Sequence, residues 1–385
     1  MIERAGAAVP ALPNAAAAPG QRGDALASCA RPSIGRLGWN SYQVCGVIGY
    51  LVALTLVMAL AARAGIGPAG RLALAVAPPA AFLLLARCTS LVFGGERIVF
   101  YESALAACGA AVLGLWAVGA DVRAGTDLAV LGVGTFLCFG RVGCFRVACC
   151  HGRPARWGVR YGEAHARAGL SPRWVGPVLF PIQLVDGALS GALVLAGVAC
   201  LLGGAPALAP TALYVCGYGL GRFAIEFARG DDARAYALGV SEAQWTALGT
   251  SWAAAALRPA AATVAAAAAL TIAVLALVVA RRKGLLASLW LTQARHLVEV
   301  ESAFRRLRSG EAKGVVSTGE GLCVSMQPLE GASPLLDFIL SRPGGRRPLS
   351  PRTARRIAAH LGRGWTVRAV LPGRTPGLIH VVVDG

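Results

Sequence analysis

The sequence predicts an all-α membrane protein that crosses the bilayer about seven times and carries a small soluble α/β domain at its C-terminal end. Of its 385 residues, 56% are hydrophobic and 15% are charged, whereas about a quarter of the residues are charged in a typical soluble domain. Apolar segments of about 20 residues, the length that crosses the hydrocarbon core, recur between residues 42 and 280. These observations exclude an ordinary soluble protein.

Each predicted span is an apolar run bounded by polar or glycine-rich sequence. Pro78 and Pro79 interrupt the second run, which a buried membrane helix tolerates because neighbouring groups satisfy the freed carbonyls. The seven predicted spans lie near residues 42–62, 70–92, 103–120, 127–147, 182–203, 209–229 and 261–280.

The basic residues predict how the spans are oriented. Arg281, Arg282 and Lys283 follow the last span, and positive charge beside a span favours the cytoplasmic side. With seven spans, a cytoplasmic C-terminus places the segment between the fourth and fifth spans outside the cell. That segment holds six arginines, from Arg146 to Arg173, which conflicts with the same rule.

The chain is expected to divide into three parts. Residues 1–40 are rich in Ala, Pro and Gly and have no charged region followed by an apolar one. They therefore predict a disordered leader and not a cleavable signal peptide. Residues 41–283 form the membrane domain, and residues 284–385 form a soluble domain.

The C-terminal part predicts a small α/β unit. Residues 285–308 are expected to form an amphipathic helix, because Trp290, Leu297 and Phe304 recur every seven residues. Strands are predicted at 323–326, 365–371 and 378–383, and a helix from Ser350 and Pro351 to Gly362. No motif in this part has recognisable chemistry, so partner binding, regulation and a purely structural role all stay open.

Charge and cysteine content limit the classes of partner. The net charge is +18, and a basic protein of this kind binds nucleic acid or anionic lipid. The apolar spans favour membrane lipid and argue against nucleic acid. The eleven cysteines are an odd number, mostly in apolar runs, which argues against a disulfide framework.

Residues 140–153 are the most informative stretch. They place Arg141 beside Gly140 and Gly143 at the end of an apolar span. An arginine inside the bilayer costs about 2.5–3.5 kcal/mol and therefore predicts a functional site. The anion available there is the phosphate of a phospholipid.

A second polar pattern lies in the sixth span. Tyr214, Tyr218, Arg222, Glu226 and Arg229 follow at steps of four, four, four and three, so they share one face of a helix. One interpretation is a buried Arg222–Glu226 ion pair that fixes packing. The other is that Arg222 binds a phosphate bidentately while Glu226 orients it.

Two smaller groups have competing interpretations. Gln183 and Asp186 have three alternative interpretations. They bind hydroxyls of the lipid head group, they hold a neighbouring arginine, or they are ordinary residues at the start of a helix. Cys144, Cys149, Cys150 and His151 resemble metal ligands, but adjacent cysteines do not readily chelate one ion, so no metal is predicted. His151 is either a base or, as we expect, a surface side chain at the level of the head groups.

Three motifs, in order, resemble the prolipoprotein diacylglyceryl transferases. Residues 140–153 are similar to the glycine-arginine signature of that family, in the variant with Gly-Cys-Phe followed by a Cys-Cys pair, and residues 157–161 continue the pattern. Pro181, Gln183 and Leu184 resemble its Pro-x-Gln-Leu element, and residues 218–231 its last signature. The resemblance covers about residues 40–283.

The resemblance implies an enzyme of the bacterial inner membrane that needs no cofactor. It would transfer the diacylglyceryl group of phosphatidylglycerol to the lipobox cysteine thiol of a prolipoprotein and release glycerol phosphate. The candidate catalytic residues are Arg141, Arg222, Glu226, Tyr101 and Glu102. The candidate substrate-binding residues are Arg141, Gly143, Cys144, Gly152, Arg153, Gln183, Tyr218 and Arg229.

The chain departs from the family pattern at the start of the third span. The family has a histidine and two glycines where this chain has Tyr101, Glu102 and Ser103. A tyrosine with a pKa near 10 is a weak base at neutral pH, and Glu102 either replaces the base or pairs with Arg97. The alternative function is therefore an inactive homologue that binds anionic phospholipid and recruits partners through its C-terminal domain.

Overall fold

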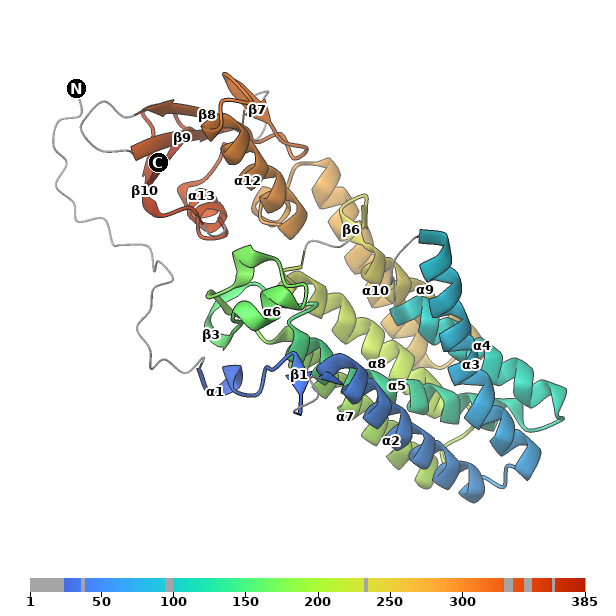
Figure 1. Ribbon diagram of the computed structural model, residues 1–385. Coiled ribbons are helices and arrows are strands. Elements are labelled where there is room, and N and C mark those ends of the chain that lie inside the picture. Colours follow the sequence, from blue (N-terminus) through green and yellow to red (C-terminus); the bar gives the residue numbers. More distant parts are fainter. Residues whose placement is uncertain are drawn as a thin grey trace.

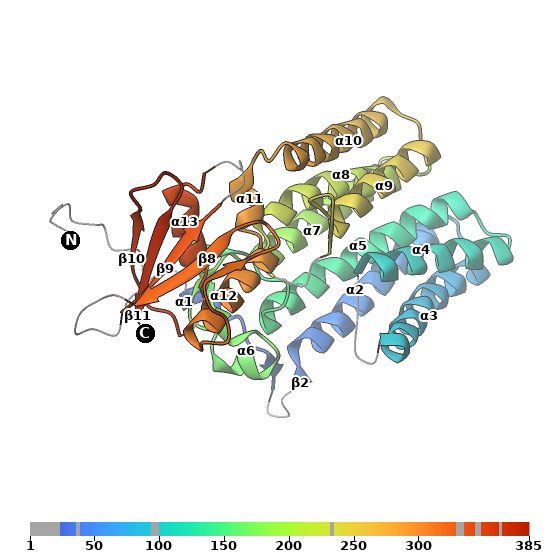
Figure 2. The ribbon, with the colours of Figure 1, turned by 90° about the horizontal axis from the view of Figure 1, so that it is seen from above.

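The computed structural model describes residues 24–35, 39–93, 100–231, 235–328, 335–342, 348–361 and 364–384. Long helices lie side by side in a bundle, and a small sheet with its helices sits at one end (Figures 1 and 2). The helices of the bundle are α2 (Ser41–Arg63), α3 (Pro68–Phe93), α4 (Phe100–Ala117), α5 (Val122–Val147), α7 (Ile182–Leu202), α8 (Ala209–Ile225), α9 (Glu242–Leu257) and α10 (Ala261–Arg282).

The predicted class, a multi-pass α-helical membrane protein, is confirmed. Six of these helices, α2, α3, α4, α5, α7 and α10, are long and apolar enough to cross a membrane. Helix α8 has 17 residues and continues into a short 3-10 turn, η2 (Glu226–Ala228). Every predicted span therefore corresponds to a helix, including the second, which contains Pro78 and Pro79.

Helix α9 is absent from the sequence-based expectation. It has 16 residues, and polar side chains such as Thr246, Thr250 and Ser251 interrupt its apolar run. A signal for its start is nevertheless present. The Ser241 hydroxyl accepts a hydrogen bond from the backbone N–H of Gln244 over 3.3 Å. In return, the side-chain Oε1 of Gln244 accepts one from the backbone N–H of Ser241 over 3.0 Å. This reciprocal pair is a capping box.

Helix α9 runs antiparallel to α8. Gln244, in its first turn, donates to the Phe223 carbonyl near the end of α8 over 3.4 Å. Arg258, just past its last turn, donates to the Ala207 carbonyl before the start of α8 over 3.3 Å. The chain therefore makes one more turn than predicted, and α10 returns to the end of the bundle where α8 finishes.

The segment between α5 and α7 consequently lies at the same end as the C-terminal domain (Figure 1). Arg173 of this segment pairs with Glu301 of the domain at 3.6 Å, and the rings of Trp174 and His360 are 6.5 Å apart. The prediction that these two parts lie on opposite sides is wrong, because α9 was not counted. Since both basic regions lie at one end of the bundle, the arginines between α5 and α7 no longer conflict with the rule that positive charge favours the cytoplasmic side.

Helix α5 is the centre of the bundle and the most buried of the candidate spans. It packs against α2, α4, α7 and α8. Glycines permit these close approaches, as is usual between membrane helices: a Cβ at Gly134 would lie 2.4 Å from the Tyr214 ring. The outer helices instead expose large apolar side chains such as Leu83, Leu113 and Ile272, as a lipid-facing surface requires.

The segment between α5 and α7, residues 148–181, is called the signature loop below. It contains β3 (Pro154–Arg160), paired with β4 (Val178–Leu179), and the short helices α6 (Glu163–Arg167) and η1 (Pro172–Trp174). Its core includes Tyr161 and Trp174, which pack against Phe145 of α5 and Ala30. The loop is thus a folded cap on the bundle.

Part of the predicted leader has secondary structure. Within it the structure describes α1 (Asp24–Ala27), β1 (Ser33–Ile34) and β2 (Trp39–Asn40), while residues 1–23 and 36–38 lie outside the described residues. The division of the chain into three domains at residues 40 and 283 stays a prediction.

The C-terminal domain is a five-stranded antiparallel sheet with helices against it. The order of the strands in this sheet is β10-β11-β9-β8-β7. Strands β5 (Tyr236–Ala237) and β6 (Val240–Ser241) do not belong to this domain; they form a separate hairpin before α9. The elements of the domain are α11 (Ala287–Leu291), α12 (Ala294–Arg308), β7 (Val315–Ser317), β8 (Cys323–Pro328), β9 (Leu335–Ser341), α13 (Pro351–Ala358), β10 (Val367–Pro372) and β11 (Ile379–Asp384).

The predicted elements of this domain are confirmed with one change. The helix expected over 285–308 is broken between α11 and α12 at Thr292. Trp290, Leu297 and Phe304 are all buried, as their spacing predicts. Strands β7 and β9 have no counterpart in the expectation, and Gly362, the predicted end of α13, lies outside the described residues.

Candidate functional site

Charged side chains meet inside the bundle where α5, α7 and α8 come together. Arg141 Nε lies 2.8 Å from Asp186 Oδ2, and both side chains are buried. The Tyr218 hydroxyl donates to Asp186 Oδ1 over 3.0 Å. Of the interpretations of Asp186, the one in which it holds a neighbouring arginine is therefore confirmed, and the pair joins α5 to α7.

Arg222 is the other buried guanidinium of this region, with 1% of its surface exposed. Its Nη1 lies 2.7 Å from Oε2 of Glu226, one turn further along the chain. Its Nε and Nη2 have no hydrogen-bond partner in the described part of the chain. Buried donors without partners are costly, so this side chain has free capacity for an oxyanion.

A cavity of about 130 Å³ lies beside Arg222 between α4, α5, α8 and α9. Tyr101 and Tyr218 also line it, and most of its remaining wall is apolar. In such surroundings a charge–charge interaction is much stronger than in water. The cavity therefore combines a cation, the three phenols of Tyr101, Tyr214 and Tyr218, and a low-dielectric wall.

Helix α9 completes this cavity with residues that the sequence analysis missed. Ala243, Thr246, Ala247 and Thr250 form one wall. They recur at steps of three and one, as the inward face of a helix does. The capping box at Ser241 is the only sequence signal that points to this helix.

The two candidates at the start of α4 lie in different surroundings. Tyr101 lines the cavity, whereas the neighbouring Glu102 is exposed and is not part of the cavity wall. Successive residues of a helix point about 100° apart, which accounts for the difference. Arg97, the partner considered for Glu102, lies outside the described residues.

Several predicted substrate-binding residues hold the signature loop in place. Gln183 donates through Nε2 to the Cys149 carbonyl over 2.9 Å. The Gly152 amide donates to the Phe180 carbonyl over 3.2 Å, and a Cβ at Gly152 would lie 2.4 Å from that oxygen. Arg153 donates through Nε to the Arg229 carbonyl over 3.1 Å. These contacts position the loop over the end of α8.

Gly143 and Arg229 are also engaged by the protein. A Cβ at Gly143 would lie 3.2 Å from both the Tyr42 Cα and the Cys45 Cβ, so this glycine lets α5 approach α2. Arg229 makes two parallel bonds to Asp231, of 2.8 and 2.9 Å. Burial disfavours its charge, but the ionised form of Cys150 and the carboxylate of Asp231 raise the pKa of Arg229 well above its usual value.

His151 is buried, with 4% of its surface exposed, so the expectation of a surface histidine is wrong. Its Nδ1 is 2.9 Å from the Gly152 carbonyl oxygen, and its ring meets Trp174 edge-on at 5.2 Å. Burial lowers the pKa of His151 from its usual value. The imidazole is therefore neutral at pH 7.

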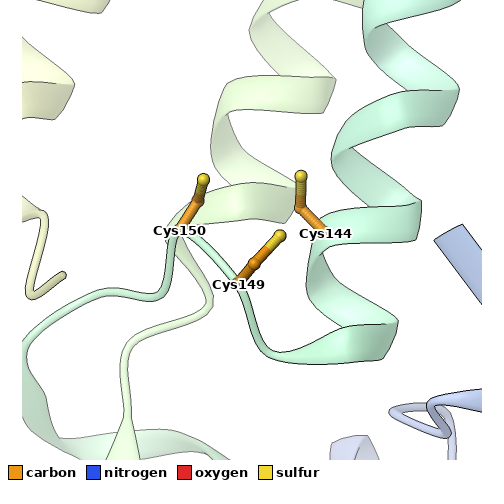
Figure 3. A group of neighbouring side chains, drawn as sticks. All are labelled: Cys144, Cys149 and Cys150. Carbon is orange, nitrogen blue, oxygen red and sulfur yellow. The ribbon is translucent and has the colours of Figure 1, made fainter. Parts of the chain in front are cut away.

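Cys144, the remaining candidate, lies with two other thiols. The sulfur atoms of Cys144, Cys149 and Cys150 are all within 4.8 Å of one another (Figure 3). Adjacent cysteines are not expected to chelate one ion readily, but here both sulfurs lie close to a third. The prediction that no metal binds here stays a prediction, but the spacing of the cysteines no longer supports it.

A family model described as prolipoprotein diacylglyceryl transferase matches residues 32–258, more than half of the chain. The matched region contains every element that lines the cavity and ends directly after α9. The last matched helix is α9, whereas the expected resemblance extends to about residue 283 and includes α10. No curated protein matches the chain.

Proposed function

The chain belongs to the prolipoprotein diacylglyceryl transferase family, and from this premise we propose that it transfers the diacylglyceryl group of phosphatidylglycerol. The acceptor is the thiol of a lipobox cysteine in a prolipoprotein, and the membrane is the bacterial inner membrane. The observation that carries the proposal is Arg222, whose Nε and Nη2 lack partners among the described residues beside a mostly apolar cavity.

The proposed role of Arg222 follows from the charge that the reaction creates. The donor phosphodiester carries one negative charge, and the departing glycerol phosphate carries up to two. Donors that are fixed before the reaction stabilise such charge most effectively, because nothing has to reorganise. Glu226 fixes one edge of the guanidinium at 2.7 Å and leaves the other edge for the phosphate oxygens.

Arg141 adds a second positive charge close to the same site. Its pairing with Asp186 fixes its position, and the phenol of Tyr218 links this pair to the cavity. In this proposal Arg141 stabilises the departing phosphate by its field. Tyr101 is a hydrogen-bond donor to the donor lipid, whereas the hydroxyl proton of Tyr218 is already donated to Asp186.

The bond changes balance without a redox step. The acceptor sulfur forms a C–S bond to the glycerol carbon that carries the phosphate. The C–O bond to the phosphate breaks, and its electron pair stays on the phosphate oxygen. The thiol must first lose its proton, and a free thiol with a pKa near 8.5 is only partly ionised at pH 7.

The second candidate is an inactive homologue that binds anionic phospholipid. Two observations favour it: Tyr101 stands where the family has a histidine, and the signature loop is in contact with the C-terminal domain through Arg173 and Glu301. In this case the cavity holds lipid, and the C-terminal domain recruits partners. The predicted cytoplasmic location of the C-terminal domain would put the signature loop on the cytoplasmic side as well.

The test uses purified full-length protein in mixed micelles of phosphatidylglycerol with a peptide that carries a lipobox cysteine. Mass spectrometry of the peptide should show the gain of one diacylglyceryl group on the cysteine. A peptide with serine at that position is the acceptor control. Arg156→Ala, which removes an exposed arginine of the signature loop, is the matched control for Arg222→Ala.

Transfer by the wild type and by Arg156→Ala, but not by Arg222→Ala, is the expected result. No mass gain with phosphatidylglycerol still bound to the protein would contradict the proposed activity and favour the inactive homologue. Equal transfer by Arg222→Ala and the wild type would contradict the role given to Arg222.

A further inference from the structure

Three thiols converge at the junction of α5 and the signature loop. The sulfur atoms of Cys144, Cys149 and Cys150 lie within 4.8 Å of one another, and no other such group of potential metal ligands is found among the described residues. Figure 3 shows Cys144 on α5 and the other two on the chain that leaves it, with the three side chains gathered together. Cys144 is buried and Cys149 is exposed, so the group has one side open.

The backbone is bent in a way that brings the thiols together. Ala148 and Cys150 have φ angles of 64° and 53°, a left-handed conformation that is uncommon and costs about 1–2 kcal/mol for a residue with a side chain. Gln183 holds the intervening Cys149 carbonyl at 2.9 Å, and the Gly230 amide holds the His151 carbonyl at 2.9 Å. These bonds keep the bent segment in place.

The spacing of the sulfurs suits a zinc ion. Zinc–sulfur bonds of about 2.3 Å place the sulfurs of one ion about 4 Å apart, within the observed limit of 4.8 Å. No histidine, aspartate or glutamate belongs to the same group in the described residues. His151 is held by Gly152 and Trp174. A site with three protein ligands keeps its fourth position open, as catalytic zinc sites do.

The surrounding charge also suits this ion. Three thiolates and one Zn²⁺ have a net charge of −1, which a buried site must offset. Arg229 and Arg141 both interact electrostatically with Cys150, and Arg141 lies one turn before Cys144 on α5. The two guanidinium groups favour the thiolate form of Cys150, and each is also held by a carboxylate, that of Asp186 or Asp231.

We propose that Cys144, Cys149 and Cys150 bind one zinc ion, and that the open fourth position binds the acceptor cysteine thiol. The second part rests on the proposed transferase function. On binding, the acceptor S–H bond breaks, its proton goes to solvent, and a zinc–sulfur bond forms. The bound thiolate then attacks the glycerol carbon, and the C–O electron pair leaves with the phosphate, so no oxidant or reductant is needed.

The proposed zinc site would deprotonate the acceptor thiol, a step for which the described residues that line the cavity offer no strong base. A thiol that coordinates zinc is deprotonated, whereas Tyr101, at the position of the family's histidine, is a weak base. Arg141 connects the two places, since it interacts with Cys150 and pairs with Asp186 next to Tyr218. The nucleophile and the phosphate would thus be held on either side of Arg141.

Metal binding is tested first and without reference to activity. The full-length protein, reduced and freed of metal with a chelator, is titrated with Co²⁺, whose absorption reports sulfur ligands. We expect one equivalent to bind with thiolate-to-cobalt charge-transfer bands, and Zn²⁺ to displace it. The triple variant C144S/C149S/C150S should lose these bands, and the matched control Cys138→Ser, which removes another cysteine of α5, should keep them.

The open position is tested by adding the lipobox peptide to the cobalt-loaded protein. The cysteine peptide should change the cobalt spectrum and the serine peptide should not. In the transfer assay at pH 7, removing zinc should slow transfer by about 30-fold, because only about 3% of a thiol with a pKa near 8.5 is ionised there. Added Zn²⁺ should restore the rate in the wild type and in Cys138→Ser only.

Different results overturn different statements. Absence of cobalt binding by the reduced protein, or a disulfide among the three cysteines in protein isolated under native conditions, overturns the metal site. Full transfer by the metal-free enzyme or by the triple variant overturns the zinc-bound nucleophile and leaves the transferase function standing. Cobalt binding with a response to the cysteine peptide but no transfer supports the site and contradicts the transferase function.

Discussion

Arg141 and Arg222 are both buried in the helical bundle, but their partners differ. Arg141 pairs with Asp186 of a different helix at 2.8 Å, so it ties α5 to α7. Arg222 pairs with Glu226 of its own chain segment at 2.7 Å, and its Nε and Nη2 have no partner among the described residues. Arg141 thus connects two helices, whereas Arg222 keeps two donors unpaired among the described residues, and the proposed role of Arg222 rests on this difference.

The largest effect on activity is expected for Arg222→Ala. Removing one fixed donor to a developing oxyanion lowers turnover by about 100- to 1,000-fold. Arg222→Lys should also be poor, because a lysine lacks the planar fork that binds two oxygens. Initial rates of peptide modification and a thermal melt in detergent would separate catalysis from folding. If Arg222→Ala lowered the rate by less than about threefold, Arg222 would not have the ligand-binding role that distinguishes it from Arg141.

Arg141→Ala should reduce both activity and stability. Breaking a buried ion pair by removing one partner costs about 3–5 kcal/mol, because the other charge stays buried. The double variant R141A/D186A should recover part of the lost thermal stability but none of the lost activity. If the single variant melted like the wild type, Arg141 would not have the structural role that its link to α7 indicates.

Gly187 and Gly191 of α7 provide a matched pair of variants that tests whether the position of Arg141 matters. A Cβ at Gly187 would lie 3.2 Å from the Arg141 Cβ and 3.3 Å from the Cys138 carbonyl oxygen, whereas at Gly191 it would lie 3.4 Å from the Cys138 sulfur. Gly187→Ala should therefore displace Arg141 and cost about 1–3 kcal/mol through overpacking. Gly191→Ala should be nearly neutral. Equal melting temperatures and rates for the two variants would contradict this positioning of Arg141.

The smallest effect is expected for Tyr218→Phe. It removes the 3.0 Å hydrogen bond to Asp186 and leaves the Arg141–Asp186 pair, so it should cost about 1 kcal/mol of stability. Tyr214→Phe, which removes a 2.7 Å hydrogen bond between hydroxyls of Tyr214 and Ser190, is the control. A loss of activity as large as that of Arg222→Ala would show that the phenol, and not the guanidinium, is the main ligand of the donor.

Local hydrophobic runs and periodicity were sufficient to predict the bundle helices other than α9, and the polar face of α8. Tyr214, Arg222, Glu226 and Arg229 are buried, as their spacing predicts. The i,i+4 pair between Arg222 and Glu226 is likewise a property of one helix. Such features depend on neighbours in the sequence, so the sequence alone defines them.

Features that depend on distant contacts or on unusual backbone angles were not predictable. Helix α9 has 16 residues, and Thr246, Thr250 and Ser251 interrupt its apolar run; its packing against α8 and α10 makes it part of the cavity. The contact between Cys149 and Cys150 depends on the left-handed φ of Ala148 and Cys150, which no residue type there signals. Missing α9 also led to the wrong expectation that the signature loop and the C-terminal domain lie on opposite sides.

The most direct test of the central claim is whether Arg222 binds the phosphate of the donor. Native mass spectrometry would measure how much phosphatidylglycerol stays bound to the wild type, to Arg222→Gln and to Arg156→Gln, an equal loss of charge at an exposed position. We expect the wild type and Arg156→Gln to retain one lipid molecule and Arg222→Gln to lose it. Retention by Arg222→Gln at the wild-type level would contradict the account.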